Sequence, residues 1–445
     1  MHPQWNLNTP KSDNGVTACD RPCILLVADF AFMPAVSGNT KRVASLVSAI
    51  RSWGYTVHFL GLGSNWSDSA VAATQAAVDT FTMHEWNAKL DPYGLPASQL
   101  LPQRAWRWMQ RRLCQCLGLW PPALDPDLPQ RCPNSFCGFV QEKAHELKPV
   151  AVIAEYLWLS RCLVDLPPGI HRIIDSHDLM HQRLLQYRGS GLHSFFQCTL
   201  SKELKCLRRA DAVLVIQEEE KRLLIPHLQN TQLISTPHGH DIVPPSVRNR
   251  TNHLLFAGSG HSANIEGLQW FLHSIWPIIL EQDSTVGLTL AGGCCNGIAG
   301  FIDYTHGRPR VNVLGIVDDL VAEYHKADVL INPILRGSGL KIKVVEALCC
   351  GMGVVSTTKG VEGIKDIEQC QSIRVADRPE QFAEATLALL RSKDNISESS
   401  MHFASQQFSI RAAYKDLQTL LNDSNRTCEH QRNAEAPLSN VGLHE

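Results

Sequence analysis

Two lysines and a glutamate in one short segment have the residue types and the spacing of an anion-binding site. Residues 336–364 read RGSGLKIKVVEALCCGMGVVSTTKGVEGI, so that Lys341 and Lys343 begin an apolar helix that carries Glu346. A lysine in a first helical turn faces the positive end of the helix dipole, at a cost of about a few tenths of a kcal/mol. A bound anion would offset that cost, because free N–H groups and ammonium groups would hold it together.

The spacing also indicates which anion the segment binds. Lys343 and Glu346 are three residues apart and therefore share a helix face. That face offers a cation for phosphate and a carboxylate for sugar hydroxyls, and the backbone of Gly337, Ser338 and Gly339 precedes it. We predict a binding site for a nucleotide diphosphate. The alternative is a solvated lysine–glutamate pair on an ordinary helix.

The composition limits the class of protein. The chain has 445 residues, enough for two domains with full cores. Its formal net charge of −2 argues against a dominant nucleic-acid-binding surface, so no nucleic-acid partner is expected. No apolar run reaches the roughly 18–20 residues that span a bilayer. The polar N-terminus lacks the apolar core of a signal peptide, which predicts a cytoplasmic protein.

The cysteines favour the same compartment. Their number, 15, is odd, and several lie inside apolar helix or strand patterns, which predicts free buried thiols in a reducing environment. Four others form a C-x-C…C-x4-C group, a spacing that fits zinc sites poorly, so no metal is expected there. These four are Cys114, Cys116, Cys132 and Cys137.

Short apolar runs alternate with helical periodicity along most of the chain, which predicts an α/β fold with parallel sheets. The pattern starts twice, so we predict two Rossmann-like domains facing each other across an interdomain cleft, with ligands beyond the carboxyl ends of the strands. The predicted strands are residues 23–30, 55–62, 151–157, 172–176, 211–216, 232–236, 253–259, 286–293, 311–315, 328–333 and 353–357. The predicted divisions are a disordered lead (1–20), an N-terminal domain (21–240), a hinge (241–252), a C-terminal domain (253–400), a helix able to pack back across the hinge (401–423) and a polar tail (424–445).

A glycine loop follows the first predicted strand. Gly38 in SGNTKR opens the next helix, so its backbone can approach a diphosphate closely. Asn39 or Thr40 can cap that helix, and Arg42 can reach phosphate. The alternatives are a simple glycine turn and a solvated arginine.

The C-terminal domain offers two further loops. Gly258 lies at the end of its first predicted strand and Gly260 directly after it, in AGSGHSAN, and both have the same two interpretations as Gly38. The segment GVEGI (360–364) follows its last predicted strand and carries Glu362, a candidate sugar contact.

Together these motifs resemble glycosyltransferase family 4, the group 1 glycosyltransferases with the GT-B fold, from Ile24 to about Leu421. The order and spacing of the markers carry the resemblance, and the last is the most specific. The markers are PAVSGNTKR (34–42), ADAVLVIQEEEKRLL (210–224), TPHGHD (236–241), LLFAGSGHSANIEGLQWFLHSIWP (254–277) and YHKADVLINPILRGSGLKIKVVEALCCGMGVVST (324–357).

The resemblance implies a retaining transfer of a sugar, of hexosyl type, from a nucleotide-diphosphate sugar to an acceptor hydroxyl in polysaccharide or glycolipid assembly. Lys341 and Lys343 would stabilise the leaving diphosphate, and Glu346 would accept hydrogen bonds from the ribose. The family commonly has a second glutamate where this chain has Ser338, as in its Gly-Ser-Gly-x-Lys-x-Lys variant. We therefore expect the contacts to the diphosphate to match those of the family and the contacts to the donor sugar to differ at Ser338.

The residues expected to contact the acceptor form a less specific pattern than those expected to bind the nucleotide sugar. Residues 173–183, IIDSHDLMHQR, follow a buried strand, and His177 or Asp178 could orient or activate the acceptor hydroxyl. Capping of a helix by Asp178 is the alternative. The basic and aromatic segment 104–113, RAWRWMQRRL, could contact a membrane that holds a lipid-linked acceptor, or it could be an amphipathic helix. No metal or other cofactor is expected, because no Asp-x-Asp motif is present.

Three other functions fit parts of this pattern. A non-hydrolysing nucleotide-sugar epimerase would bind the same diphosphate without an acceptor. A non-catalytic sugar-nucleotide-binding subunit would fit the serine at position 338. A nicotinamide dehydrogenase is disfavoured, since neither glycine loop reads G-x-G-x-x-G.

Overall fold

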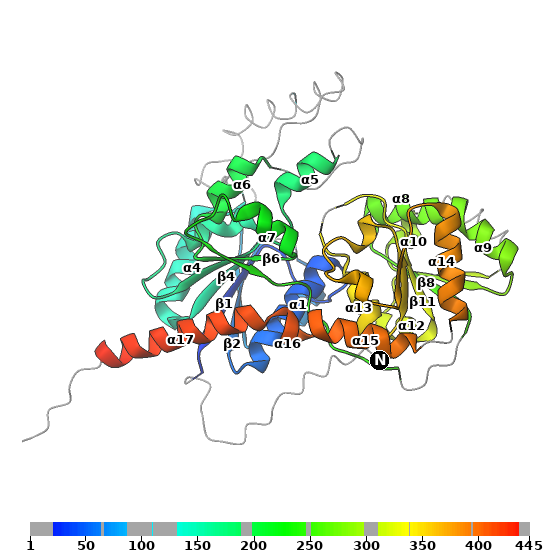
Figure 1. The fold of residues 1–445 in the computed structure, drawn as a ribbon. Coiled ribbons are helices and arrows are strands. Elements are labelled where there is room, and N and C mark those ends of the chain that lie inside the picture. The colour runs from blue at the N-terminus through cyan, green and yellow to red at the C-terminus, as the bar shows by residue number, and fades with distance from the viewer. Residues whose placement is uncertain are drawn as a thin grey trace, which may run out of the picture.

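The structure of the chain is a computed structural model, which describes residues 21–63, 66–86, 109, 131–187, 198–245, 251–297, 310–337, 339–392 and 395–435. Two parallel sheets, each with helices on its faces, form two domains that lie side by side (Figure 1). Ser338, Cys114 and Cys116, the N-terminal lead and nearly all of 104–113 lie outside the described residues. The predicted fold class of two Rossmann-like domains is confirmed.

The N-terminal sheet has seven parallel strands in the order β3-β2-β1-β4-β5-β6-β7. Its central strands are apolar throughout and buried, as expected for a sheet covered on both faces. The strands are β1 (Cys23–Ala28), β2 (Thr56–Leu62), β3 (Thr80–His84), β4 (Ala151–Glu155), β5 (His171–Asp175), β6 (Ala212–Val215) and β7 (Gln232–Ser235). The helices are α1 (Gly38–Ser52), α2 (Asp68–Ala77), α4 (Asn134–Leu147), the 3-10 helix η2 (Leu157–Leu163), α5 (Met180–Tyr187), α6 (Leu200–Leu207) and α7 (Glu218–Leu224).

The C-terminal sheet has six parallel strands in the order β10-β9-β8-β11-β12-β13. The strands are β8 (His253–Ala257), β9 (Gly287–Ala291), β10 (Val311–Gly315), β11 (Val329–Asn332), β12 (Gly353–Ser356) and β13 (Ile373–Val375). The helices are α8 (Ser262–Trp270), the π-helix η3 (Phe271–Ile275), α9 (Trp276–Gln282), α10 (Cys294–Gly297), α12 (Leu320–Lys326), α13 (Ile342–Cys349), the short η5 (Lys359–Val361) and η6 (Ile367–Gln369), and α14 (Pro379–Arg391).

Each sheet has one switch point, where the strand order reverses. In the N-terminal sheet it lies between β1 and β4, and in the C-terminal sheet between β8 and β11. Loops that leave neighbouring strands at such a point diverge to opposite faces and open a crevice for ligands. The loops after β1, β8 and β11 carry Gly38, Gly258 and Gly339, so the topology brings the predicted glycine loops to these crevices.

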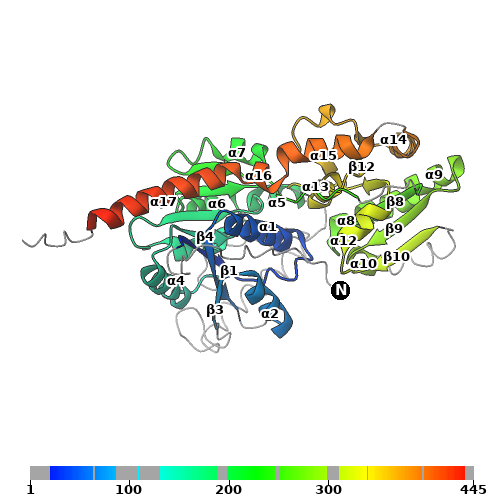
Figure 2. The same ribbon diagram turned by 90° about the horizontal axis from the view of Figure 1, so that it is seen from below.

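In the described part of the chain, two segments cross between the domains. The first crossing is the linker from β7 to β8, and the second follows α15 (Ile396–Gln407) into α16 (Ile410–Ala413) and α17 (Lys415–Glu435). These three helices run along one side of both domains (Figures 1 and 2). Tyr414, Leu417 and Leu421 belong to the same apolar core as β1 and α1. The two crossings touch, since His240 N donates to Phe408 O at 2.7 Å.

The cysteines predicted inside apolar elements lie where the sequence places them. Cys23, Cys206, Cys349 and Cys350 are all buried. Among the residues that the structure describes, no helix combines the length and the hydropathy needed to cross a membrane.

Tyr414 is predicted to anchor the second crossing. Tyr414→Ala should lower the free energy of unfolding by about 3–5 kcal/mol, because it empties a fully buried aromatic site. Tyr414→Phe is the control. It loses only the hydroxyl, which bonds Ser45 Oγ at 3.2 Å and accepts from Gly239 N at 3.4 Å, and should cost about 1 kcal/mol. Urea unfolding measures both, and equal losses in the two variants would contradict the packing argument.

Candidate functional site

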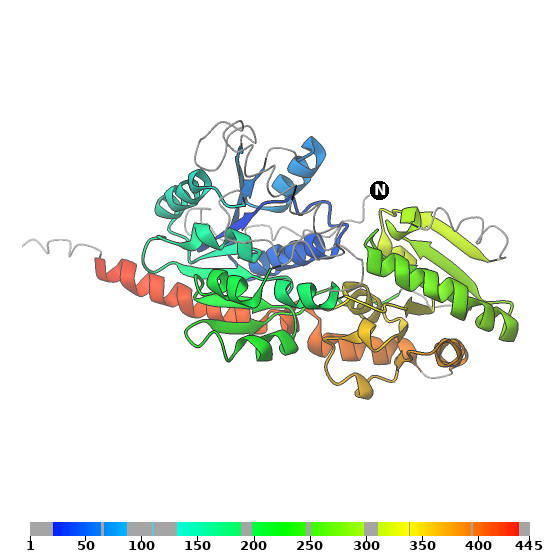
Figure 3. The ribbon, with the colours of Figure 1, turned by 90° about the horizontal axis from the view of Figure 1, so that it is seen from above.

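The first turns of α1 and α13 face each other between the two domains. A Cβ on Gly38, the first residue of α1, would lie 3.3 Å from Ile342 Cδ1, at the start of α13. One turn into α1, Lys41 Nζ lies 2.6 Å from Glu346 Oε1 and 2.8 Å from Oε2. Figure 3 shows α1 directed toward the C-terminal domain. The two domains therefore form opposite walls of one site.

The two predicted lysines are half-buried in this site. Lys341 is the N-cap of α13, and its ammonium donates to Gly339 O at 2.5 Å. Lys343 donates to Asn264 Oδ1 at 2.8 Å, and its Nζ lies 4.3 Å from the centre of the Phe256 ring. Burial lowers the pKa of Lys341 to about 8 and that of Lys343 to about 7. Two ammonium groups held at such a cost indicate a place that a ligand's negative charge would stabilise.

The glycine loops come close to these lysines because they lack side chains. A Cβ on Gly258 would lie 3.3 Å from Lys343 Nζ, and one on Gly260 would lie 3.3 Å from Gly293 O. Gly337 and Gly339 have φ of +116° and +77°, a region that favours glycine. A Cβ on Gly339 would also lie 2.5 Å from an oxygen of Asp178 of the N-terminal domain. The loop before α13 therefore lies directly against the N-terminal domain.

Glu346 is held by groups from both domains. Besides Lys41, the Tyr324 hydroxyl donates to its Oε2 at 2.9 Å. Burial by itself raises the pKa of Glu346, but Lys41, His240 and His238 more than offset this and lower it to about 2. The carboxylate, in a residue only 4% exposed, is therefore ionised and can accept hydrogen bonds.

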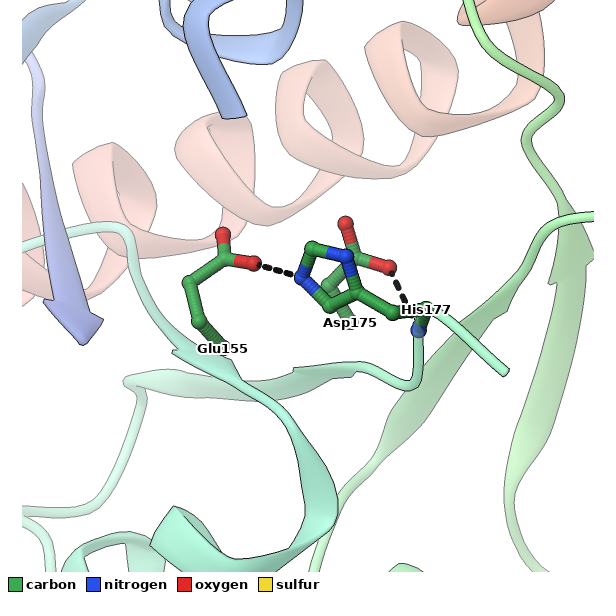
Figure 4. A group of neighbouring side chains, drawn as sticks. All are labelled: Glu155, Asp175 and His177. Atoms are coloured by element: carbon green, nitrogen blue, oxygen red, sulfur yellow. Dashed lines mark hydrogen bonds and ion pairs between the residues drawn. The ribbon is translucent and has the colours of Figure 1, made fainter. Parts of the chain in front are cut away.

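His177 lies at the carboxyl end of β5 in a group with two carboxylates (Figure 4). Its Nε2 is 2.5 Å from Glu155 Oε2, and its backbone N–H points to Asp175 Oδ1 at 3.4 Å. Its ring stacks on Tyr156 with 4.0 Å between the ring centres. Both rings stand on backbone of positive φ, +58° at His177 and +69° at Tyr156. Such strained positions gather at functional sites.

Arg42 has a structural role, which corrects the expectation that it reaches phosphate. Its residue is 1% exposed, and its guanidinium holds Asp175 through Nε at 2.8 and 3.0 Å and Nη2 at 2.8 Å. Nη1 donates to Thr236 O at 2.7 Å. Burial raises the pKa of Asp175, but Arg42 outweighs it, so the pKa lies below its usual value. Arg42 faces inward because it precedes the buried Leu46 by one helical turn.

The same ion pair decides whether a metal fits this group. Ligand atoms of Glu155, Asp175 and His177 lie within 4.8 Å of one another, and all three residues are buried. Both Asp175 oxygens, however, already accept from Arg42. The guanidinium therefore supplies the positive charge that a metal ion would bring, and the group fits a metal poorly.

The remaining predicted residues, Asp178 and Glu362, lie near Lys341, whose pKa both carboxylates act to raise. Asp178 pairs with Arg183 Nη2 at 2.6 Å. It does not provide the cap considered for it, because the first N–H groups of α5 donate to the buried Glu203 at 2.8 and 3.0 Å. Glu362 Oε2 lies 2.6 Å from Lys359 Nζ.

The start of α1 also differs from expectation. Its N-cap is Ser37, not Asn39 or Thr40. Ser37 N donates to Thr40 Oγ1 at 2.9 Å, and Ser37 Oγ donates to Asn39 Oδ1 at 2.6 Å.

Lys41, Asn264, Tyr324 and Glu155 were missed by sequence reasoning. A signal was present for Lys41 alone. It is a lysine in a first helical turn, and the same dipole argument that singled out Lys341 and Lys343 applies to it.

The site lies between two Rossmann-like domains, and known proteins share parts of this arrangement. Residues 251–392 match the family model described as glycosyl transferases group 1. This part of the chain therefore resembles the group 1 glycosyltransferases, and the chain as a whole has the GT-B fold. The match agrees with the group 1 part of the predicted resemblance.

Two solved structures share the fold of this chain, and a curated bacterial protein matches part of its sequence. Sucrose-phosphate synthase from Thermosynechococcus elongatus shares the fold with a TM-score of 0.58 at 14% identity, over 92% of this chain and 100% of that one. HepE from Anabaena, in complex with UDP, gives 0.60 at 13% identity, over 90% and 99%. A protein of Klebsiella pneumoniae described as an uncharacterized 44.6 kDa protein in the cps region is 32% identical over 105 residues. That match spans 22% of this chain and 27% of the relative.

Removal of Arg42 tests its structural role. Arg42→Met should lower the free energy of unfolding by about 3–5 kcal/mol, because it leaves Asp175 as an uncompensated buried charge. Arg51→Met is the matched control, since its pair with Asp79 at 3.2 Å is partly exposed and should contribute about 0–1 kcal/mol. Both are measured by urea unfolding. A loss for Arg42→Met no larger than the control's would refute the assignment.

The burial of Lys343 predicts how stability changes with pH. Its pKa of about 7 lies below the ordinary 10.5, so between these values the unfolded chain binds a proton that the folded chain has lost. Stability should therefore rise with pH across that window. Lys343→Met removes this term, and we expect a higher Tm than wild type near pH 7 and a smaller rise toward pH 10. A lower Tm near pH 7 in ligand-free thermal melts would count against a buried ammonium.

Proposed function

We propose that the protein is a retaining glycosyltransferase that moves a sugar, of hexosyl type, from a nucleotide-diphosphate sugar to an acceptor hydroxyl. The observation that carries the proposal is the position of the half-buried Lys341 and Lys343 beside glycine loops at the switch points of two facing sheets. The UDP in the HepE structure, a protein of the same fold, supports a nucleoside diphosphate as the ligand.

The proposed role of each residue follows from its charge. Lys341, Lys343 and the backbone of the loop before α13 would stabilise the diphosphate as it gains negative charge on leaving. Glu346, ionised at neutral pH, would accept hydrogen bonds from the ribose hydroxyls. In this scheme the lysines neutralise the leaving group, so the proposed reaction needs no metal and no other cofactor.

The acceptor would approach from the N-terminal domain. Asp178 is beside Gly339, so an acceptor hydroxyl held there would lie next to the donor. His177 is held by Glu155 and is 4% exposed. It would help to orient or activate the acceptor hydroxyl at the edge of that space. A leaving phosphate oxygen would take the acceptor proton, which is consistent with retention at the anomeric carbon.

We further propose a carbohydrate or lipid-linked acceptor in polysaccharide or glycolipid assembly. The support is the relative described as lying in a cps region. Peripheral membrane contact through residues 104–113 stays part of this proposal, although only Met109 of that segment is among the described residues.

The proposal is tested by incubating the protein with UDP-, GDP-, ADP- and dTDP-sugars and with oligosaccharide and lipid-linked acceptors. Proton NMR of the product should show the anomeric configuration of the donor. Inversion would overturn retention. Isomerisation of the donor without acceptor would indicate an epimerase, and binding of donor without any turnover would indicate a non-catalytic subunit.

Two variants test the proposed contacts, one to the diphosphate and one to the ribose. Lys343→Met and Glu346→Gln should each lower donor turnover at least about tenfold, which corresponds to about 1.4 kcal/mol of barrier. Lys326→Met serves as control, since Lys326 pairs with Glu323 on the exposed side of α12. Initial rates at fixed acceptor measure the effect. Near-normal rates in both variants would remove these residues from the site.

A further inference from the structure

The position of Lys41 suggests a function beyond that of a link between domains. Its ammonium contacts both oxygens of Glu346, at 2.6 and 2.8 Å. In the proposed function these oxygens are the acceptors for the ribose hydroxyls. The inference that follows rests on that function. The ribose hydroxyls of a bound sugar nucleotide can donate to both oxygens of Glu346 only if Lys41 releases at least one of these oxygens.

The surroundings of Lys41 favour a ligand in place of this pair. Lys41 stands in the first turn of α1, where no acidic residue balances the helix dipole. Lys341 and Lys343 stand at the start of the facing helix α13. Glu346 is paired with Lys41 and acts electrostatically on Lys343, whereas the carboxylates that act on Lys341 are Glu362 and Asp178. A dianionic diphosphate between the two helix N-termini would add negative charge beside Lys41 and Lys343.

A second observation indicates that the polar contacts around Glu346 are incomplete without ligand. His238, in the first crossing between the domains, is 2% exposed, and neither of its ring nitrogens has a hydrogen-bond partner among the described residues. Burial lowers the pKa of His238 to about 3, and the charge of Glu346 is the largest effect that raises it. The ring is therefore neutral. Buried polar groups of this kind are normally paired. Hydroxyl groups of a donor bound at Glu346 would offer such partners.

We propose that Lys41 is a donor-binding residue that changes partner when the donor arrives. The ribose hydroxyls replace its ammonium on Glu346, and the ammonium turns to the diphosphate beside Lys343. The movement required is small. Lys343 and Glu346 lie one turn apart on α13, about 5 Å along the helix. No covalent bond changes, and the exchange conserves charge, since one ion pair is replaced by another.

This exchange makes a prediction that a plain interdomain link does not. A nucleoside without phosphates competes with Lys41 for Glu346 and gains nothing from the released ammonium. A nucleoside diphosphate meets the same competition but gains a cation. Removal of Lys41 should therefore strengthen binding of the nucleoside and weaken binding of the diphosphate. Loss of a plain link would weaken both.

Calorimetric titration tests this difference in sign. UDP, GDP, ADP and dTDP are first titrated into the wild-type protein, and the base that binds most tightly is then used as nucleoside and as diphosphate. For Lys41→Met we expect diphosphate affinity at least tenfold weaker and nucleoside affinity several-fold tighter. Lys41→Arg should recover most of the diphosphate affinity.

The matched control is Lys365→Met. Lys365, in the C-terminal domain, also forms a pair between the domains, with Glu218 of α7 at 3.2 Å. Neither residue is among those proposed to bind the donor. This variant should leave both affinities unchanged. Thermal melts check that each variant is folded.

The outcomes are distinct. Equal weakening of both ligands by Lys41→Met, or no change in either, overturns the exchange while leaving the proposed function in place. If the folded wild-type protein binds none of the four diphosphates, the proposed function fails, and the exchange fails with it.

Discussion

The buried pair between Arg42 and Asp175 connects the parts of the molecule on which the site depends. Arg42 fixes α1 against the end of β5, and through Thr236 it also holds the start of the linker to the second domain. Its partner Asp175 in turn accepts from the backbone of His177. One guanidinium therefore sets the position of Gly38 and Lys41 on one side and of His177 on the other.

The region between α1 and α13 gathers positive charge in surroundings that do not favour it. Burial lowers the pKa values of Lys341 and Lys343, and Glu362 and Asp178 near Lys341 and Glu346 near Lys343 offset this only in part. A protein selected for stability alone would place apolar side chains there. The cost is consistent with a site whose stabilising partner is the ligand, as in other cases where activity and stability conflict.

Sequence periodicity predicted eleven of the thirteen strands found among the described residues, and two Rossmann-like domains, because parallel strands buried on both faces are continuous apolar runs. It missed β3, TFTMH, a partly exposed edge strand, and β13, which has three residues. The glycine loops and the lysines of α13 were predicted from local features. The partner of Arg42 lies 133 residues away and that of Lys41 lies 305 residues away, so no local pattern could identify either. For Arg42, however, its helical spacing to Leu46 already indicated an inward orientation.

The double crossing between the domains has a mechanical consequence. Because the linker after β7 and the segment before α16 are hydrogen-bonded to each other, these two connections between the domains lie side by side. Lys41 and Glu346 join the domains at a separate place, between α1 and α13. Rotation of one domain about the paired connections would separate α1 from α13, whereas sliding of the domains past each other would also break the bond between the connections.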